Sequence, residues 1–162
     1  MTEVIHNSKV NGVTEGEDET ARVKDIFKKI VQGSSHDKVL DKVEVIYAGN
    51  GRFIGEMLIE PEHTNIYGSL HGGFTATLID ICTSIAMSTH PRKGNGVSVD
   101  LNISYLKPGL LNERIVITAD TIRVGKTMGF SEAVITSKAS GDILAKGMHT
   151  KYVDSVKYAL TK

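Results

Sequence analysis

Apolar residues recur three and four positions apart near the N-terminus, which predicts an amphipathic helix over 20–32. Gly33 follows this segment as a stop signal. The residues before the helix are polar and include several acids, so we expect 1–19 to form a flexible tail. We expect a short C-terminal tail over 156–162, which leaves 20–155 as one domain.

Most of the remaining chain has the pattern of β-strands. Apolar residues alternate over 42–48 and 52–59, and Gly49-Asn50-Gly51 between them is a hairpin signal. Four further strand-like runs follow in the second half, over 97–106, 113–124, 127–137 and 143–152. Because short connections separate these runs, we expect successive strands to be antiparallel neighbours.

A long segment between the two groups of strands is apolar on nearly every side. It extends from Gly72 to Thr89 and ends at His90-Pro91, since proline cannot continue a helix. A helix of this kind is normally buried on most sides. The pattern therefore predicts an α+β fold in which a curved antiparallel sheet wraps around one long central helix.

The loop that leads into this helix carries the most informative chemistry. It is polar and glycine-rich, contains Asn65 and His71, and ends at Gly72-Gly73. A helix N-terminus offers unpaired N–H groups and the positive end of the helix dipole. Asp80 lies about two turns further along, in an otherwise apolar segment. Together these residues indicate a site where negative charge is formed and stabilised.

Composition narrows the range of functions. Lysine plus arginine equals aspartate plus glutamate, so the formal net charge is zero and we expect no nucleic-acid partner. The longest apolar stretch, around 74–87, is short and interrupted by Asp80, so we expect no membrane insertion. The single Cys82 and the lack of a signal-peptide pattern favour a reducing, cytoplasmic location. The histidines lack metal-ligand spacing, and we expect no metal or other cofactor.

Four stretches carry a recognisable combination of motifs: HTNIYGSLHGGFTATLID (63–80), GVSVDLNISYLKP (96–108), GKT (125–127) and KGMHTKY (146–152). They resemble the hotdog-fold acyl-CoA thioesterases, in particular the thioesterase superfamily member 2 branch and the phenylacetate-pathway thioesterases. The resemblance covers about 42–152. It implies a homodimer whose sheets join edge to edge, dimers paired into a homotetramer, and active sites shared between subunits. Some such relatives associate with mitochondria, so the resemblance gives a mitochondrial location as the alternative to the cytoplasmic one.

The resemblance also implies roles for single residues. The Gly72 N–H would donate to the thioester oxygen, and Asp80 would act as general base or as nucleophile. Asn65 matches a residue near the thioester or the attacking water, although a loop asparagine also commonly bonds its own backbone. Ser98 matches a serine that assists the attacking water.

Further positions match segments that contact substrate in relatives, namely His71, Gly73, Lys126, Thr127, His149 and Lys151. The last four would meet CoA, whose phosphates need cations or backbone donors. His71 could equally cap the helix. Two residues depart from the family pattern: Met148 replaces an expected polar or basic residue, and Tyr67 is larger than expected and would narrow the acyl entrance.

The spacing of Gly72 and Asp80 bears on how they work together. Eight residues along one helix correspond to about 12 Å, at roughly 1.5 Å per residue. This is too far for both groups to touch one thioester carbonyl, which supports a site where Asp80 of one subunit serves Gly72 of the other. The leading interpretation is therefore a hotdog acyl-CoA thioesterase. The alternatives are an enoyl-CoA hydratase of the same fold and a non-catalytic acyl-CoA-binding protein.

Overall fold

The computed structural model describes residues 9–10, 13–92 and 96–153. Its two main helices are α1 (Glu15–Val31) and α2 (Gly72–Thr89), and two short 3₁₀ helices are η1 (His36–Leu40) and η2 (Pro61–His63). The strands are β1 (Lys9–Val10), β2 (Val13–Thr14), β3 (Glu44–Gly49), β4 (Arg52–Leu58), β5 (Val97–Tyr105), β6 (Arg114–Val124), β7 (Met128–Ser137) and β8 (Ile143–Tyr152).

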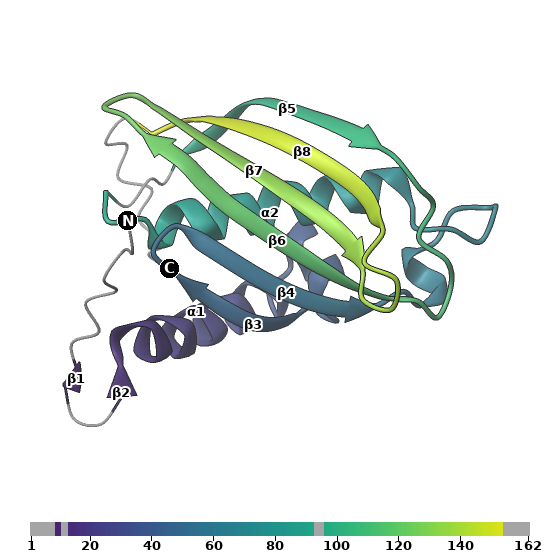
Figure 1. Ribbon diagram of the computed structural model, residues 1–162, viewed down its shortest axis with the longest axis horizontal. Coiled ribbons are helices and arrows are strands. Elements are labelled where there is room, and N and C mark those ends of the chain that lie inside the picture. The colour runs from purple at the N-terminus through teal and green to yellow at the C-terminus, as the bar shows by residue number, and fades with distance from the viewer. Residues whose placement is uncertain (1–8, 11–12, 93–95, 154–162) are drawn as a thin grey trace.

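Six strands form one antiparallel sheet in the order β3-β4-β6-β7-β8-β5. The sheet curves around α2, and α1 packs beside β3 (Figure 1). This arrangement confirms the predicted α+β fold with a sheet wrapped around one central helix. No helix within the described ranges is long and apolar enough to cross a membrane.

The position of β5 corrects one expectation. The short connection after it led us to expect β5 beside β6, and this pairing was wrong: β5 pairs with β8 at the far edge of the sheet. Eight residues, 106–113, join the two strands. Such a segment can reach about 26 Å, whereas three strand spacings amount to only about 14 Å. The connection can therefore cross the end of the sheet, and β6 pairs with β4 and β7 instead.

The predicted hairpin between β3 and β4 is confirmed. Asn50 and Gly51 both have positive φ, 51° and 82°, as a two-residue turn of the I′ type requires. Helix α1 is also confirmed but begins at Glu15, earlier than expected. An ion pair between Arg22 and Glu19 supports its first turns, and the Thr20 hydroxyl donates to the carbonyl of Ala48 in β3 over 3.0 Å. Residues 1–8 and 154–162, which include the expected C-terminal tail, lie outside the described ranges.

The core lies between α2 and the concave face of the sheet. Leu78, Ile79 and Cys82 of α2 are fully buried there, as are many apolar side chains of β4, β6 and β7. Gly147 allows the helix to approach closely, because a Cβ at this position would lie 2.7 Å from Ile79. Burial of a side chain such as Ile79 contributes about 2 to 3 kcal/mol. The packing therefore holds α2 firmly in place, and with it the residues on its outer surface.

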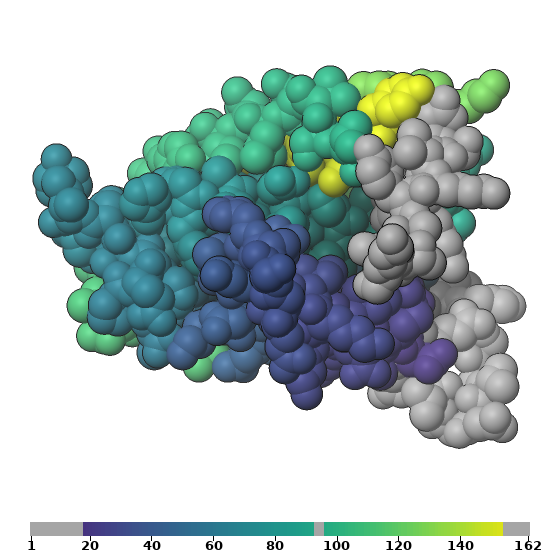
Figure 2. Space-filling view, turned by 180° about the vertical axis from the view of Figure 1, so that it is seen from behind, coloured from purple at the N-terminus to yellow at the C-terminus, as the bar shows by residue number. Residues whose placement is uncertain are grey.

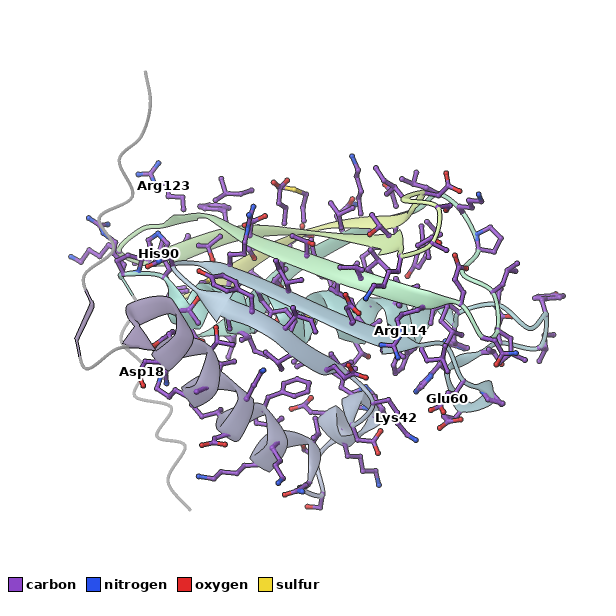
Figure 3. All side chains as sticks on the ribbon, turned by 60° about the horizontal axis from the view of Figure 1, so that its bottom comes forward. Asp18, Lys42, Glu60, His90, Arg114 and Arg123 are labelled. Atoms are coloured by element: carbon purple, nitrogen blue, oxygen red, sulfur yellow. The ribbon has the colours of Figure 1, made fainter. Side chains whose placement is uncertain are left out.

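The opposite surface of α2 is only partly covered. Figure 2 shows this side, where α2 (teal) is visible between α1 (purple to blue) and β5 (green). The two ends of the helix lie at opposite ends of the molecule: His90 and Arg123 mark one end, and Glu60 and Arg114 mark the other (Figure 3). Gly72 lies at the N-terminal end of α2, and Asp80 lies near its middle, so the two residues are separated along the helix within one chain.

Candidate active site

The loop before α2 is held in shape by Asn65. Its side-chain oxygen accepts hydrogen bonds from the backbone N–H groups of Tyr67, at 2.9 Å, and Ser69, at 3.3 Å. This is the local role that the sequence left open for Asn65. Tyr67 is 85% exposed at the tip of the loop, so within one chain it does not narrow a cavity.

His71 occupies the N-cap of α2. Its Nδ1 accepts a hydrogen bond from the Gly73 N–H at 2.9 Å, so His71 has the capping role that we considered as an alternative. The Gly72 N–H has no hydrogen-bond partner among the described residues. A donor of this kind at a helix N-terminus, where the dipole is positive, can stabilise a developing oxyanion.

A cavity of about 390 Å³ lies next to Gly72. Its lining includes Asn65, Gly72, Tyr105 and the apolar side chains of Leu70 and Leu144. The Tyr105 hydroxyl donates to the Gly72 carbonyl over 3.0 Å, which ties the end of β5 to the start of α2. Sequence reasoning did not single out Tyr105, although it lies within the GVSVDLNISYLKP stretch.

The second part of the site surrounds Asp80, whose side chain is 39% exposed. Its Oδ1 lies 3.3 Å from the Ser98 hydroxyl and 3.6 Å from Nε2 of His149. Ser98 and His149 are themselves 2.9 Å apart. Three elements, α2, β5 and β8, thus bring a carboxylate, a hydroxyl and an imidazole together.

Lys151 lies on the same face of β8, two residues beyond His149. It is 7% exposed, and its ammonium group donates to Ser84 over 2.6 Å. Ser84 in turn donates to the backbone carbonyl of Asp80. We expected His149 and Lys151 among the CoA contacts; in this chain both side chains are buried and lie beside Asp80, and the contact with CoA stays a prediction.

Burial governs the electrostatics of this group. It lowers the pKa of His149 below the ordinary value, and the charge of Lys151 acts in the same direction, against the opposing effect of Asp80. Burial also lowers the pKa of Lys151, again opposed by Asp80. A histidine with a lowered pKa is neutral at pH 7, so its contact with Asp80 is not an ion pair.

Lys126 and Thr127 lie in the turn between β6 and β7 and are exposed. The Thr127 carbonyl accepts from the N–H of Val153, and the nearby Arg92 donates to the Val124 carbonyl over 3.2 Å. This turn is at the same end of the sheet as Ser98, because Val97, Tyr152 and Met128 are paired across adjacent strands. Its exposed lysine is available to an anionic ligand from solvent.

Three side chains of a type that can ligate a metal ion lie close together elsewhere, at η2. The ligand atoms of Glu60, Glu62 and His63 lie within 4.8 Å of one another. The Nδ1 of His63, however, accepts the backbone N–H of Glu60 as part of a helix cap. The position of His63 in this cluster is therefore explained by the helix cap.

The two parts of the site mark opposite ends of β5: Ser98 contacts Asp80 near its start, and Tyr105 contacts Gly72 at its end. The structure does not bring Gly72 and Asp80 together within one chain. This agrees with the separation expected from their spacing along α2.

Comparison with known proteins assigns the family. The chain is 42% identical over 134 residues to human acyl-coenzyme A thioesterase 13, a match that covers 83% of this chain and 96% of the human protein. Residues 67–143 match the Thioesterase superfamily profile. The chain belongs to the thioesterase superfamily. The resemblance inferred from the four motifs is thus confirmed.

Solved structures of the superfamily agree with the hotdog fold. The crystal structure of zebrafish thioesterase superfamily member 2 matches with a TM-score of 0.81 and 42% identity, over 83% of this chain and 97% of that one. A hypothetical thioesterase protein from Streptococcus pneumoniae, solved with coenzyme A, matches with a TM-score of 0.64 and 25% identity, over 68% of this chain and 87% of that one. The superfamily match over 67–143 includes Gly72, Asp80 and Ser98 but ends before His149 and Lys151.

Proposed function

We propose that this protein hydrolyses acyl-CoA thioesters to a free acid and CoA, and that it does so as a homodimer with two shared active sites. The two parts of the site, one around Gly72 and one around Asp80, are called half-sites below. The single observation that carries the proposal is that these half-sites lie at opposite ends of the edge strand β5. The relatives named as acyl-CoA thioesterase, and the related structure with coenzyme A, support the choice of substrate.

Strand β5 has the properties of a pairing surface. It pairs with β8 on one side and with no other strand of the described chain, and Val97 and Val99 are 46% and 59% exposed. An edge strand with unpaired backbone groups is a template for another strand. Antiparallel pairing of two β5 strands around a two-fold axis places the Ser98 end of one beside the Tyr105 end of the other. Asp80 of one subunit then approaches Gly72 of the second copy.

The chemistry follows from this arrangement. The Gly72 N–H donates to the thioester oxygen and stabilises the oxyanion that forms when water attacks the carbonyl carbon. Asp80 accepts a proton from that water as general base, with Ser98 beside it to orient the water. The carbon–sulfur bond then breaks, the acyl group leaves as the free acid, and the CoA sulfur takes up a proton. If Asp80 were instead the nucleophile, its carboxylate would form a mixed anhydride with the acyl group as the carbon–sulfur bond breaks, and mass spectrometry of the rapidly quenched enzyme would detect the acylated chain.

Substrate recognition uses the surroundings of both half-sites. The cavity beside Gly72 has apolar walls that include Leu70 and Leu144, which suits an acyl or aryl group. Lys126 and Thr127 are exposed at the other end of the sheet, where they can meet the phosphates of CoA.

The first test is release of free thiol from a panel of acyl-CoAs. Wild type is expected to release CoA, and Asp80→Asn to lose nearly all activity while it keeps the same unfolding curve. The panel should include an enoyl-CoA, since water addition without thiol release would favour the hydratase alternative. Binding of acyl-CoA without any turnover would show a non-catalytic binding protein and contradict the proposal.

Sharing of the site can be tested by mixing two inactive variants. Asp80→Asn lacks the base, and Gly72→Pro lacks the N–H donor. A hybrid dimer has one site with both defects and one intact site. Random mixing should therefore restore about a quarter of the wild-type activity, because about half of the dimers are hybrids with one working site of two. Hybrids that are verified by mass spectrometry and stay inactive would rule out shared sites.

A further inference from the structure

Thr83 lies three residues beyond Asp80 on α2 and is fully buried. Its hydroxyl oxygen is 2.6 Å from Nδ1 of His149, 2.6 Å from the carbonyl oxygen of Ile79 and 3.0 Å from that of Asp80. Nδ1 of His149 has no other hydrogen-bond partner among the described residues. Thr83 is therefore the group that faces the inner nitrogen of the histidine.

The number of available protons limits how Thr83 and His149 can be hydrogen-bonded. The Thr83 hydroxyl has one proton, and a threonine inside a helix commonly donates it to the carbonyl four residues back. Here that carbonyl belongs to Ile79, at short hydrogen-bond distance. The threonine oxygen can then only accept from Nδ1, so the neutral imidazole carries its proton on Nδ1. Its other nitrogen, Nε2, is left as an acceptor.

The state of Nε2 decides what Ser98 does. Ser98 also has a single hydroxyl proton, and two acceptors compete for it: Nε2 of His149 at 2.9 Å and Oδ1 of Asp80 at 3.3 Å. If Nε2 is an acceptor, the shorter bond to His149 takes the proton, and the serine oxygen faces Asp80 with lone pairs only. A water that lies beside both side chains can then donate one proton to Ser98 and the other to Asp80. If Nε2 carried the proton, it would donate to Ser98, and Ser98 would donate to the carboxylate in place of the water.

We propose that Thr83 is a positioning residue that keeps the His149 proton on Nδ1, so that Ser98 donates to His149 and leaves the Asp80 carboxylate to the attacking water. This inference rests on the proposed hydrolysis for its catalytic consequence, but the tautomer of His149 can be measured without any turnover. Thr83 acts through two other side chains and does not itself touch the substrate.

The matched variants are Thr83→Val, which keeps the shape of the side chain but lacks the hydroxyl, and Thr83→Ser, which keeps the hydroxyl. Nitrogen-15 NMR of the imidazole reports which nitrogen carries the proton, and loss of the signal in His149→Asn assigns it. We expect an Nδ1-protonated ring in wild type and in Thr83→Ser. In Thr83→Val we expect a shift to the Nε2-protonated form, because Nδ1 then has no partner.

The kinetic expectation is a fall in kcat of about 10-fold for Thr83→Val, the usual worth of one hydrogen bond, with KM little changed. Thr83→Ser should retain most of the wild-type kcat. An Nε2-protonated ring in wild type, an unchanged tautomer in Thr83→Val, or a changed tautomer with unchanged kcat would each overturn the proposal. If Thr83→Val does not fold, the His149 tautomer is measured in Thr83→Ala, which also lacks the hydroxyl. The tautomer of wild type by itself also tests the proposal. Absence of acyl-CoA hydrolysis in wild type would instead contradict the proposed function and leave the tautomer result standing.

Discussion

The two half-sites of this protein are built in different ways. The half around Gly72 depends mainly on backbone groups and neighbouring loop residues: His71 caps the helix, and Asn65 holds the loop by bonding its own backbone. Tyr105 of β5 adds one hydrogen bond from a distant strand. The half around Asp80 consists of side chains from α2, β5 and β8, which are distant in the sequence and meet only in the folded sheet. The difference teaches that a backbone donor can be specified by a short motif, whereas a positioned carboxylate needs the whole fold around it.

The largest effect is expected at the carboxylate. Asp80→Asn keeps the size of the side chain but removes the base, and general acid–base catalysis is worth about 100- to 10,000-fold. We expect kcat for acyl-CoA hydrolysis to fall by about 1,000-fold. Thiol release under saturating substrate measures it, and an unfolding curve serves as control. A loss of less than about 10-fold would place the base elsewhere.

The second largest effect is expected when the backbone N–H donor of Gly72 is removed. Proline is favoured at the first position of a helix, and His71 before it already has an extended conformation, with φ −67° and ψ 130°. Gly72→Pro should therefore fold but lose the N–H donor, with a fall in kcat of about 100- to 1,000-fold. Gly72→Ala is the matched control, because its Cβ would be in ordinary contact with Tyr105 at 3.5 Å and its N–H remains. Equal losses in both variants would count against the oxyanion role.

The helix cap should matter for stability more than for chemistry. His71→Ala removes the acceptor for the Gly73 N–H and should lower the free energy of unfolding by about 1 kcal/mol. His71→Asn, which offers another good capping side chain, should recover most of this loss. Urea denaturation of the three proteins compares them. An unchanged stability in His71→Ala combined with a large loss of activity would move His71 from the cap into the chemistry.

Acid should affect the Asp80 half through His149. Its lowered pKa means that the unfolded chain binds the proton more readily than the folded protein. Its contribution to stability is therefore complete above about pH 6.5 and is lost as the pH falls from there through the lower folded-state value. Urea denaturation at pH 7.5 and pH 5.5 should show a smaller acid-induced loss in His149→Asn than in wild type. The same loss in both would mean that burial does not penalise the charged imidazole.

Part of the site could be read from the sequence because its signals are local. Helix and strand periodicity predicted α2 from Gly72 to Thr89 and placed all six strands of the main sheet. The Gly49-Asn50-Gly51 turn and the Gly72-Gly73 helix start depend on a few adjacent residues. The spacing from Gly72 to Asp80 also follows from helix geometry, so the separation of the two half-sites was predictable.

The tertiary structure decided what lies beside Asp80. The periodicity of the sequence does not predict that β5 pairs with β8 and not with β6. Strand pairing depends on residues distant in the sequence, and the eight-residue connection after β5 is long enough to reach several strands. Only that pairing brings Ser98 beside His149, and the packing of α2 against β8 brings Thr83 and Ser84 to His149 and Lys151. The sequence by itself determined the helix, its N-terminal donor and the carboxylate two turns away. The folded sheet determined the partners that orient the carboxylate and the free edge that can complete the site.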